Sequence, residues 1–424
     1  MIRFLFKGLL RDKGRSRLPV LVVAIGVMLS VLLHAYVNGI MGDTIEMNAR
    51  FATGHVKVMS RAYAENVNQL PNDLALLDVG NLMKKLDSLY PETEWVPRIK
   101  FGGLIDAPDE KGETKTQGPA VGMGIDLLSG NSHEADRLNL NGSLVRGHLP
   151  EKPGGALLSE QFSQKLKVSP GDTVTLIGST MNGEMAMYNF RVTGTIRFGS
   201  AALDRGMIIA DIQDVRKALD MQDAAGEITG FFKKGYYNQE KADKMVKQFN
   251  ALYTNTNDEY TPEMVSLRDQ DNMALYVDMS KSMSLIVTMI FMVAMSLVLW
   301  NAGLLGGLRR YGEIGLRLAI GEEKRHVYLT MIAEAVMIGI AGSVLGTLFG
   351  LFFAWLIQHF GIDISAMMQG ASVMMPSKIR AHITPPDFYI GFIPGVISTV
   401  IGTALAGIGI YKRKTAQLFK ELEV

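Results

Sequence analysis

The run LPVLVVAIGVMLSVLLHAYVNGI at residues 18–40 decides the fold class of this chain. Its 23 residues carry no acidic or basic side chain other than a histidine, and the polar interruptions are Ser30, His34 and Asn38. About 20 apolar residues suffice for a helix to cross the hydrocarbon layer of a bilayer. A signal peptide is the competing interpretation, but the run is too long and no A-x-A-like cleavage site follows it. We therefore predict an uncleaved transmembrane helix.

Three further apolar runs predict three more transmembrane helices. They cover residues 283–308, 327–358 and 388–411, and the first and last of them contain no charged residue. The chain has 424 residues, of which 48% are hydrophobic, so part of it is expected to lie outside the membrane. The predicted fold class is a membrane α-helical protein with four transmembrane helices. A large extracytoplasmic α+β domain, residues 41–280, is inserted between the first and second spans.

The insertion reads as a folded domain because strand and helix patterns alternate along it. GHVKVM, TVTLIG, NFRVTGTIRF and GMIIA are typical of strands, and turn signals separate them. Helices are expected at 79–89, 159–166 and 211–219, with Ser159 and Asp211 as N-caps. We predict a membrane-proximal part from about 41–120 and 195–280, and an inserted distal part from about 121–194. A loop of residues 359–387 joins the third and fourth spans.

The distribution of Lys and Arg predicts the orientation in the membrane. Residues 1–17 carry six, residues 309–326 carry five and the tail after Tyr411 carries four, whereas 41–280 has 25 basic and 33 acidic residues. Basic residues near spans resist translocation. Both termini are therefore expected in the cytoplasm and 41–280 in the periplasm of a bacterial inner membrane. Residues 1–17 begin with an amphipathic pattern that fits a cytoplasmic interfacial helix or the frayed start of the first span.

Composition excludes several classes of function. The chain has no cysteine, which removes disulfides, thiolate metal sites and cysteine nucleophiles. Its seven histidines are scattered without an HExxH pair, so no metal site is expected. The net charge of +1 gives no reason to expect a nucleic-acid partner. No convergent nucleophile and base stand out, so we predict that the chain is not an enzyme and holds no cofactor.

The segment RRYGEIGLRLAIGEEKRHV, residues 309–327, is amphipathic and lies between the second and third spans. Ile314 and Leu318 fall on one side of a short helix, and Glu313 and Arg317 are spaced i,i+4. Gly321 is placed to end the helix, since glycine tolerates the left-handed conformation. By pattern alone, residues 309–326 are either a solvated turn that enforces topology or a docking element.

The run EIGLRLAIGEEKRHV, followed by Glu334, resembles the cytoplasmic signature of the ABC permease superfamily typified by MacB, FtsX and the lipoprotein-releasing LolC/LolE pair. VGMGID at 121–126, residues 146–178 and FRVTGTIR at 190–197 resemble the extracytoplasmic domain of that family. ATGHVKVMSRAY at 52–63 is closest to the LolE-like branch. The resemblance covers nearly the whole chain, although its motifs are mostly glycines and apolar positions.

The resemblance implies that 309–326 is a cytoplasmic coupling helix that docks onto an ABC ATPase. The residues it assigns to coupling are Tyr311, Glu313, Ile314, Arg317, Leu318 and Gly321. No GxxxxGK[ST] phosphate loop occurs in the chain. The ATPase, with its ATP and Mg, is therefore expected to be a separate partner, present in two copies.

Small residues at four-residue spacing predict close helix packing in the membrane. They are Gly303 and Gly307 in the second span and Gly342, Gly346 and Gly350 in the third. Packing within the chain and dimerisation of permeases both fit this pattern. Glu334 is an intramembrane acid about 10 Å into the third span at 1.5 Å per residue. Either a structural partner, such as an arginine of the neighbouring loop, or proton coupling would account for it.

Three functions remain open. The first is a transport subunit that converts ATP hydrolysis into periplasmic movement, to release lipoproteins from the inner membrane. The second is MacB-like efflux of hydrophobic compounds or peptides through an adaptor and outer-membrane duct. The third is an FtsX-like regulator of a cell-wall enzyme. Each requires the ATPase and a second permease, identical or related, and the transport functions add a periplasmic acceptor or adaptor protein and a lipoprotein or other hydrophobic substrate.

Overall fold

The computed structural model describes residues 13–109, 112–233, 236–254, 258–270, 272–308, 311–363 and 378–412. These residues form two compact units. The helical unit contains the described residues within 13–43, 278–363 and 378–412, and the α+β unit contains those within 44–277. The predicted interfacial helix lies largely outside the described residues, as does the tail after 412.

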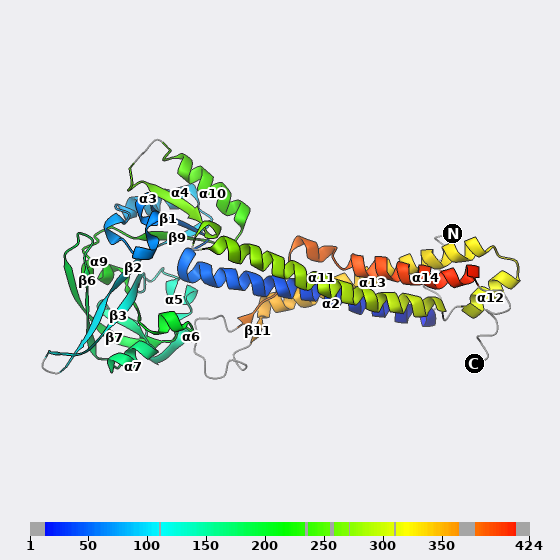
Figure 1. Ribbon diagram of the computed structural model, residues 1–424, viewed down its shortest axis with the longest axis horizontal. Helices are drawn as coiled ribbons and strands as arrows, with labels where there is room; N and C mark the ends of the chain where they lie inside the picture. Colours follow the sequence, from blue (N-terminus) through cyan, green and yellow to red (C-terminus); the bar gives the residue numbers. More distant parts are fainter. Residues whose placement is uncertain are drawn as a thin grey trace. The chain divides into compact units, whose positions relative to one another are not determined.

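Four long helical segments dominate the helical unit, and Figure 1 shows them running side by side. They are α2 (Lys13–Asn48), α11 (Met273–Leu308), α13 (Lys324–Phe360) and a fourth segment in which a 3₁₀ turn (Pro385–Phe388) and a π-helix (Ile393–Ser398) precede α14 (Thr399–Lys412). All four are long and apolar enough to cross a membrane. Helix α12 (Tyr311–Ala319) connects α11 to α13, and a two-stranded sheet joins β11 (Ile362–Asp363) to β12 (Lys378–Ile379). The predicted fold class is confirmed.

The α+β unit is built on a mixed sheet whose order is β10-β1-β9-β2-β3-β8-β5-β7-β4, with β6 between β2 and β7. The strands are β1 (Val56–Ser60), β2 (Thr93–Pro108), β3 (Thr114–Ile125), β4 (Leu144–Gly147), β5 (Gly155–Ser159), β6 (Thr173–Ser179), β7 (Met185–Ile196), β8 (Met207–Asp211), β9 (Glu227–Phe232) and β10 (Pro262–Ser266). The helices are α3 (Arg61–Glu65), α4 (Val79–Leu89), α5 (Glu134–Arg137), α6 (Leu140–Ser143), α7 (Glu160–Leu166), α8 (Ala201–Asp204), α9 (Ile212–Ala218) and α10 (Gln239–Ala251).

The central strands are buried on both faces, which explains their unbroken apolar sequences. In β8, Ile208 and Ala210 belong to one hydrophobic core, whereas Met207 and Ile209 belong to another. Helices begin directly after such strands because a polar side chain caps each start. The Ser159 hydroxyl accepts a hydrogen bond from the Phe162 amide, and the Asp211 carboxylate accepts one from the Gln213 amide. Both predicted N-caps are confirmed.

Strand pairing divides this unit differently from the predicted boundaries at 121 and 194. The long strand β2 pairs with β9 over Thr93–Arg98 and with β3 over Ile99–Pro108. One strand group is therefore β1, β9, β10 and the start of β2, and the other runs from Ile99 to Asp211. Periodicity does not show which strands pair, so these two groups could not be read from the sequence. Which group lies nearer the membrane stays a prediction.

A buried charge cluster links β1 and β9 of the first group to β2 just beyond the boundary between the two groups. The Glu227 carboxylate on β9 lies 2.7 Å from Lys57 Nζ on β1 and 2.9 Å from Lys100 Nζ on β2. The Glu227 side chain is completely buried, and Lys57 is nearly so. Burial by itself raises the pKa of Glu227, but the charges of Lys100 and Lys57 outweigh burial and lower this pKa to about 2.

Candidate functional site

Helix α12 carries apolar side chains on two opposite sides. Ile314 is only 2% exposed and packs with Leu318 against Val327 and Met331 of α13. Leu316 and Ile320 are 55% and 79% exposed. Residues two apart lie on roughly opposite sides of an α-helix, and residues four apart share a side. One side of α12 is therefore fixed to α13, and the other presents Leu316 and Ile320.

Backbone and side-chain hydrogen bonds stabilise the C-terminal end of α12. Gly321 has φ +94°, and its amide donates to the Leu318 carbonyl while the Glu322 amide donates to the Arg317 carbonyl. This pair of bonds is a Schellman motif, in which the glycine takes the left-handed conformation. The Arg317 guanidinium also binds the Glu322 carboxylate through two hydrogen bonds of 2.6 and 2.7 Å. The hydrogen bond to Glu322 raises the pKa of Arg317, and the same bond lowers the pKa of Glu322.

The predicted coupling residues thus fall into different roles. Glu313 is exposed, whereas Ile314 and Leu318 pack against α13 and so position the helix. That these residues take part in coupling stays a prediction. The charge of Glu313, the i,i+4 neighbour of Arg317, acts on this arginine. The guanidinium is hydrogen-bonded to Glu322, because the turn at Gly321 brings position 322 back to the helix. The Tyr311 side chain lies outside the described residues. The exposed pair Leu316 and Ile320 was missed, although its i,i+4 spacing is readable in the sequence.

The glycines of α13 form a groove for a ridge of valines on α2. A Cβ placed on Gly342 would lie 2.6 Å from Val23 Cβ, and one on Gly350 would lie 2.9 Å from Val31 Cβ. On Gly346 it would lie 2.5 Å from the backbone oxygen of Ala24 and 2.7 Å from Val27 Cβ. Only glycine permits helices to approach this closely.

The glycines of α11 likewise allow this helix to pack closely against α14. A Cβ on Gly303 would lie 2.7 Å from the Thr399 carbonyl oxygen, and one on Gly307 would lie 2.6 Å from Ala406 Cβ. Of the two interpretations of these glycines, the structure places the five predicted ones in packing within the chain.

Glu334 lines a small cavity of about 50 Å³ among the helices, together with Pro19, Gly303, Gly306 and Thr403. The charge of Glu334 acts on Arg317, at the end of α12. This is the type of arginine partner that the sequence suggested. A volume of this size has room for water beside the Glu334 side chain.

A second polar group ties α2 to the start of the fourth span. The Asp387 carboxylate is completely buried and lies 2.7 Å from His34 Nδ1. Its other oxygen accepts hydrogen bonds from the Thr384 amide, at 2.6 Å, and from the Thr384 hydroxyl, at 2.8 Å. Asn38 lies 3.3 Å from the His34 ring and accepts a hydrogen bond from Ser284 of α11. The cluster therefore joins three of the four spans.

Replacing Asp387 with alanine is expected to destabilise the helical unit by about 2–3 kcal/mol, because the partly buried Thr384 amide and the His34 ring lose their partner. Asp387→Asn, which keeps an acceptor oxygen, should lose less. The measurement is the unfolding midpoint of the purified chain in a mixed-micelle SDS titration. Equal midpoints for Asp387→Ala and the unmodified chain would show that the cluster contributes nothing.

The part of the chain that the structure describes contains no group of three His, Cys, Asp or Glu side chains suited to a metal ion. The described residues do form a short helix fixed to one span, spans packed through glycines, and a folded unit between the first and second spans. These features define a multi-span membrane protein with a large α+β insertion.

Family comparisons agree with this class. Residues 17–258 match the MacB-like periplasmic core domain, and residues 285–415 match the FtsX-like permease C-terminal domain. Because the first match alone covers more than half of the chain, the chain belongs to the MacB/FtsX family of ABC-transporter permeases. Permeases of this family work with a cytoplasmic ABC ATPase.

The individual proteins that are similar to this chain include two MacB proteins. The macrolide export ATP-binding/permease protein MacB of Bdellovibrio bacteriovorus is 31% identical over 109 residues, which make up 24% of this chain and 17% of that protein. The chain thus spans less than a fifth of the length of this relative. The periplasmic region of MacB from Actinobacillus actinomycetemcomitans aligns with a TM-score of 0.36 and 14% identity, over 55% of this chain and 95% of that one.

Proposed function

We propose that this chain transmits movement from a cytoplasmic ABC ATPase to its periplasmic domain, and that α12 is where the ATPase docks. The observation that carries the proposal is that α12 packs against its own chain on one side and exposes apolar side chains on the other. Its inner side is fixed by Ile314, while Leu316 and Ile320 are exposed beside Glu313. Exposed apolar side chains next to charges are typical of a protein contact.

A continuous set of contacts leads from α12 into the spans. Ile314 and the hydrogen bond from Arg317 to Thr330, at 3.4 Å, couple α12 to α13. The glycine groove then couples α13 to α2. Helix α2 runs without interruption to Asn48, beyond the predicted span. Closely packed helices move as units, so displacement of α12 is expected to shift α2.

Lipoprotein release from the inner membrane is the substrate process that we favour, on the resemblance of residues 52–63 to the LolE-like branch. In this scheme ATP and Mg bind to the ATPase partner, a second permease completes the membrane part, and a periplasmic acceptor receives the lipoprotein. Both termini lie in the cytoplasm and 41–280 in the periplasm. Efflux is the second candidate, because the name of the Bdellovibrio bacteriovorus relative assigns macrolide export to that protein.

Replacing Leu316 and Ile320 with glutamate is expected to reduce co-purification of the ATPase at least about tenfold, because two carboxylates would be buried without partners in the docked state. Leu252→Glu is the matched control, since Leu252 of the α+β unit is 54% exposed. The measurement is the amount of ATPase that remains bound to tagged chain in nanodiscs. Full ATPase recovery with the double variant would refute docking at this surface.

A release assay separates the two substrate processes. Proteoliposomes that contain the chain and its ATPase partner are loaded with an acylated lipoprotein or with a macrolide, and ATP is added. Lipoprotein release supports the favoured process, and macrolide movement alone supports efflux.

A further inference from the structure

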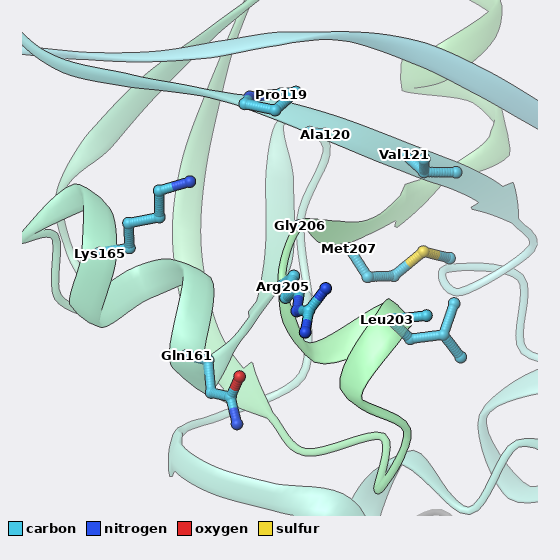
Figure 2. Close-up of a pocket in the computed structure, with 10 residues that line it drawn as sticks. Pro119, Ala120, Val121, Gln161, Lys165, Leu203, Arg205, Gly206 and Met207 are labelled. Carbon is cyan, nitrogen blue, oxygen red and sulfur yellow. The ribbon is translucent and has the colours of Figure 1, made fainter.

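A pocket of about 590 Å³ opens on the α+β unit between β3, α7 and the start of β8 (Figure 2). Its lining residues are Pro119, Ala120, Val121, Gln161, Lys165, Ala202, Leu203, Arg205, Gly206 and Met207. The volume falls in the range of sites for small molecules. Neither the sequence patterns nor the transport mechanism above assigns a role to this pocket.

Hydrogen bonds between the elements that line the pocket hold its walls in place. The Val121 amide donates to the Gly206 carbonyl at 2.8 Å, which joins β3 to the start of β8. The Ser159 hydroxyl, which caps α7, donates to the Asp204 carbonyl at 2.7 Å and so joins α7 to α8. The Thr116 hydroxyl donates to the Leu166 carbonyl at 2.5 Å and fixes the other end of α7. The pocket is therefore formed before any ligand arrives.

The polar side of the pocket carries positive charge that the neighbouring acids do not neutralise. Lys165 and Arg205 are exposed, and the structure shows no ion pair for either one within the described residues. Glu160, on the same helix as Lys165, is bound to Arg146, Gln164 and Thr195.

Asp204, next to Arg205, is also engaged elsewhere. Its carboxylate accepts hydrogen bonds from the backbone amides of Phe198, at 2.8 Å, and Gly199, at 3.1 Å. Two cations therefore face the pocket, and both of the acids nearest to them in sequence are already hydrogen-bonded. A ligand that supplies negative charge would complete this side.

The other side of the pocket is apolar. Figure 2 shows Val121, Leu203 and Met207 together on one side, with Gln161 and Lys165 extending from α7 on the other. Val121 is 49% exposed although its neighbours in β3 are buried, so this surface is available to a ligand. An anion alone would leave the apolar wall in water, and a hydrocarbon alone would leave the cations unpaired.

We propose that this pocket binds a small amphiphilic anion, with a carboxylate or phosphate between Lys165 and Arg205 and an alkyl chain against Val121 and Leu203. A fatty acid and a phosphate-headed lipid share this chemistry. Charge-assisted hydrogen bonds from Lys and Arg fix the head, and burial of apolar area holds the chain. The site is independent of the proposed docking of the ATPase.

The test is photolabelling of the full chain in phosphatidylcholine nanodiscs with a diazirine derivative of dodecanoic acid. Labelled peptides are identified by mass spectrometry. We expect labelling at the pocket residues of β3 and α8, and at least about a fivefold loss with Lys165→Glu/Arg205→Glu. Lys84→Glu, at an exposed lysine of α4, is the matched control and should keep full labelling. Both charged pocket positions are exposed, so the variants are expected to fold.

Competition identifies the head group. Unlabelled dodecanoate that competes better than dodecyl phosphate would indicate a fatty acid, and the reverse order would indicate a phosphate-headed lipid. Val121→Asn should weaken labelling without any change in charge. Equal labelling by the diazirine derivative of dodecanol, or labelling that survives Lys165→Glu/Arg205→Glu, would overturn the proposal.

Discussion

Replacing Glu227 with alanine is expected to destabilise the α+β unit by about 3–5 kcal/mol, the range found when one partner of a buried ion pair is removed. The Lys57 side chain is only 2% exposed, and its ammonium group would lose the Glu227 carboxylate that balances its charge. It retains a hydrogen bond of 2.8 Å to the Ala52 carbonyl, but that bond cannot neutralise its charge. Because β1, β2 and β9 all contribute to the cluster, the loss should lower the stability of the sheet where these three strands pair.

Tryptophan fluorescence can report this change within the full chain. Trp95 is buried in β2 of the α+β unit, and Trp300 and Trp355 lie on membrane helices. With the latter two replaced by phenylalanine, Trp95 alone reports on unfolding of the α+β unit in urea. The control is Lys57→Met/Glu227→Leu, which removes the charges together and should recover most of the loss. A Glu227→Ala variant as stable as its parent would mean that the cluster has no net role.

The lowered pKa of the Glu227 carboxylate predicts that the stability of the α+β unit depends on pH. The pKa of Glu227 is lowered from 4.5 to about 2 by folding, so its contribution is fully present above pH 5. That contribution, on the order of 3 kcal/mol, should be lost as the pH falls from about 5 to 2. Glu227→Gln should flatten this part of the pH profile. A profile that Glu227→Gln leaves unchanged would show that other groups determine the acid sensitivity.

Replacing Gly346 with valine is expected to destabilise the helical unit by about 1–3 kcal/mol, because the new Cβ would overlap atoms of α2. The nearest atom would be a backbone oxygen, that of Ala24 at 2.5 Å, which cannot move aside by rotating a side chain. The two helices must therefore separate. Under the proposed function, this separation should also weaken ATP-dependent transport, since the path from α12 to α2 passes through this contact.

Gly306→Val is the matched control, because a Cβ at Gly306 meets no atom within 4 Å. Both variants carry the same change in a glycine of a membrane helix. The measurements are the unfolding midpoint in SDS mixed micelles and the ATP-driven release rate in proteoliposomes. Equal effects of the two variants would mean that valine in a helix, and not the contact with α2, causes the loss.

The sequence predicted those features that depend on neighbouring residues. Apolar runs of sufficient length located the four spans, and short-range patterns located the N-caps Ser159 and Asp211. The helix end at Gly321 was also readable, since a left-handed residue after an amphipathic stretch calls for glycine. Each of these features is set by local chain chemistry.

Features that depend on partners distant in sequence could not be predicted. His34 and Asp387 are 353 positions apart, and neither local sequence indicates that the two side chains are in contact. Ile314 packs on α13, and the sequence could not show this, because amphipathicity does not indicate which apolar side faces the same chain. The pairing of one long strand, β2, with both strand groups was likewise not visible in periodicity.

The two apolar sides of α12 have a consequence for how the chain is produced. Under the proposed function, a molecule synthesised in excess of the ATPase leaves Leu316 and Ile320 in water. Exposed apolar side chains of this kind favour aggregation and recognition by proteases. Orphan copies should therefore be short-lived, and co-expression in matched stoichiometry should raise the yield of intact chain.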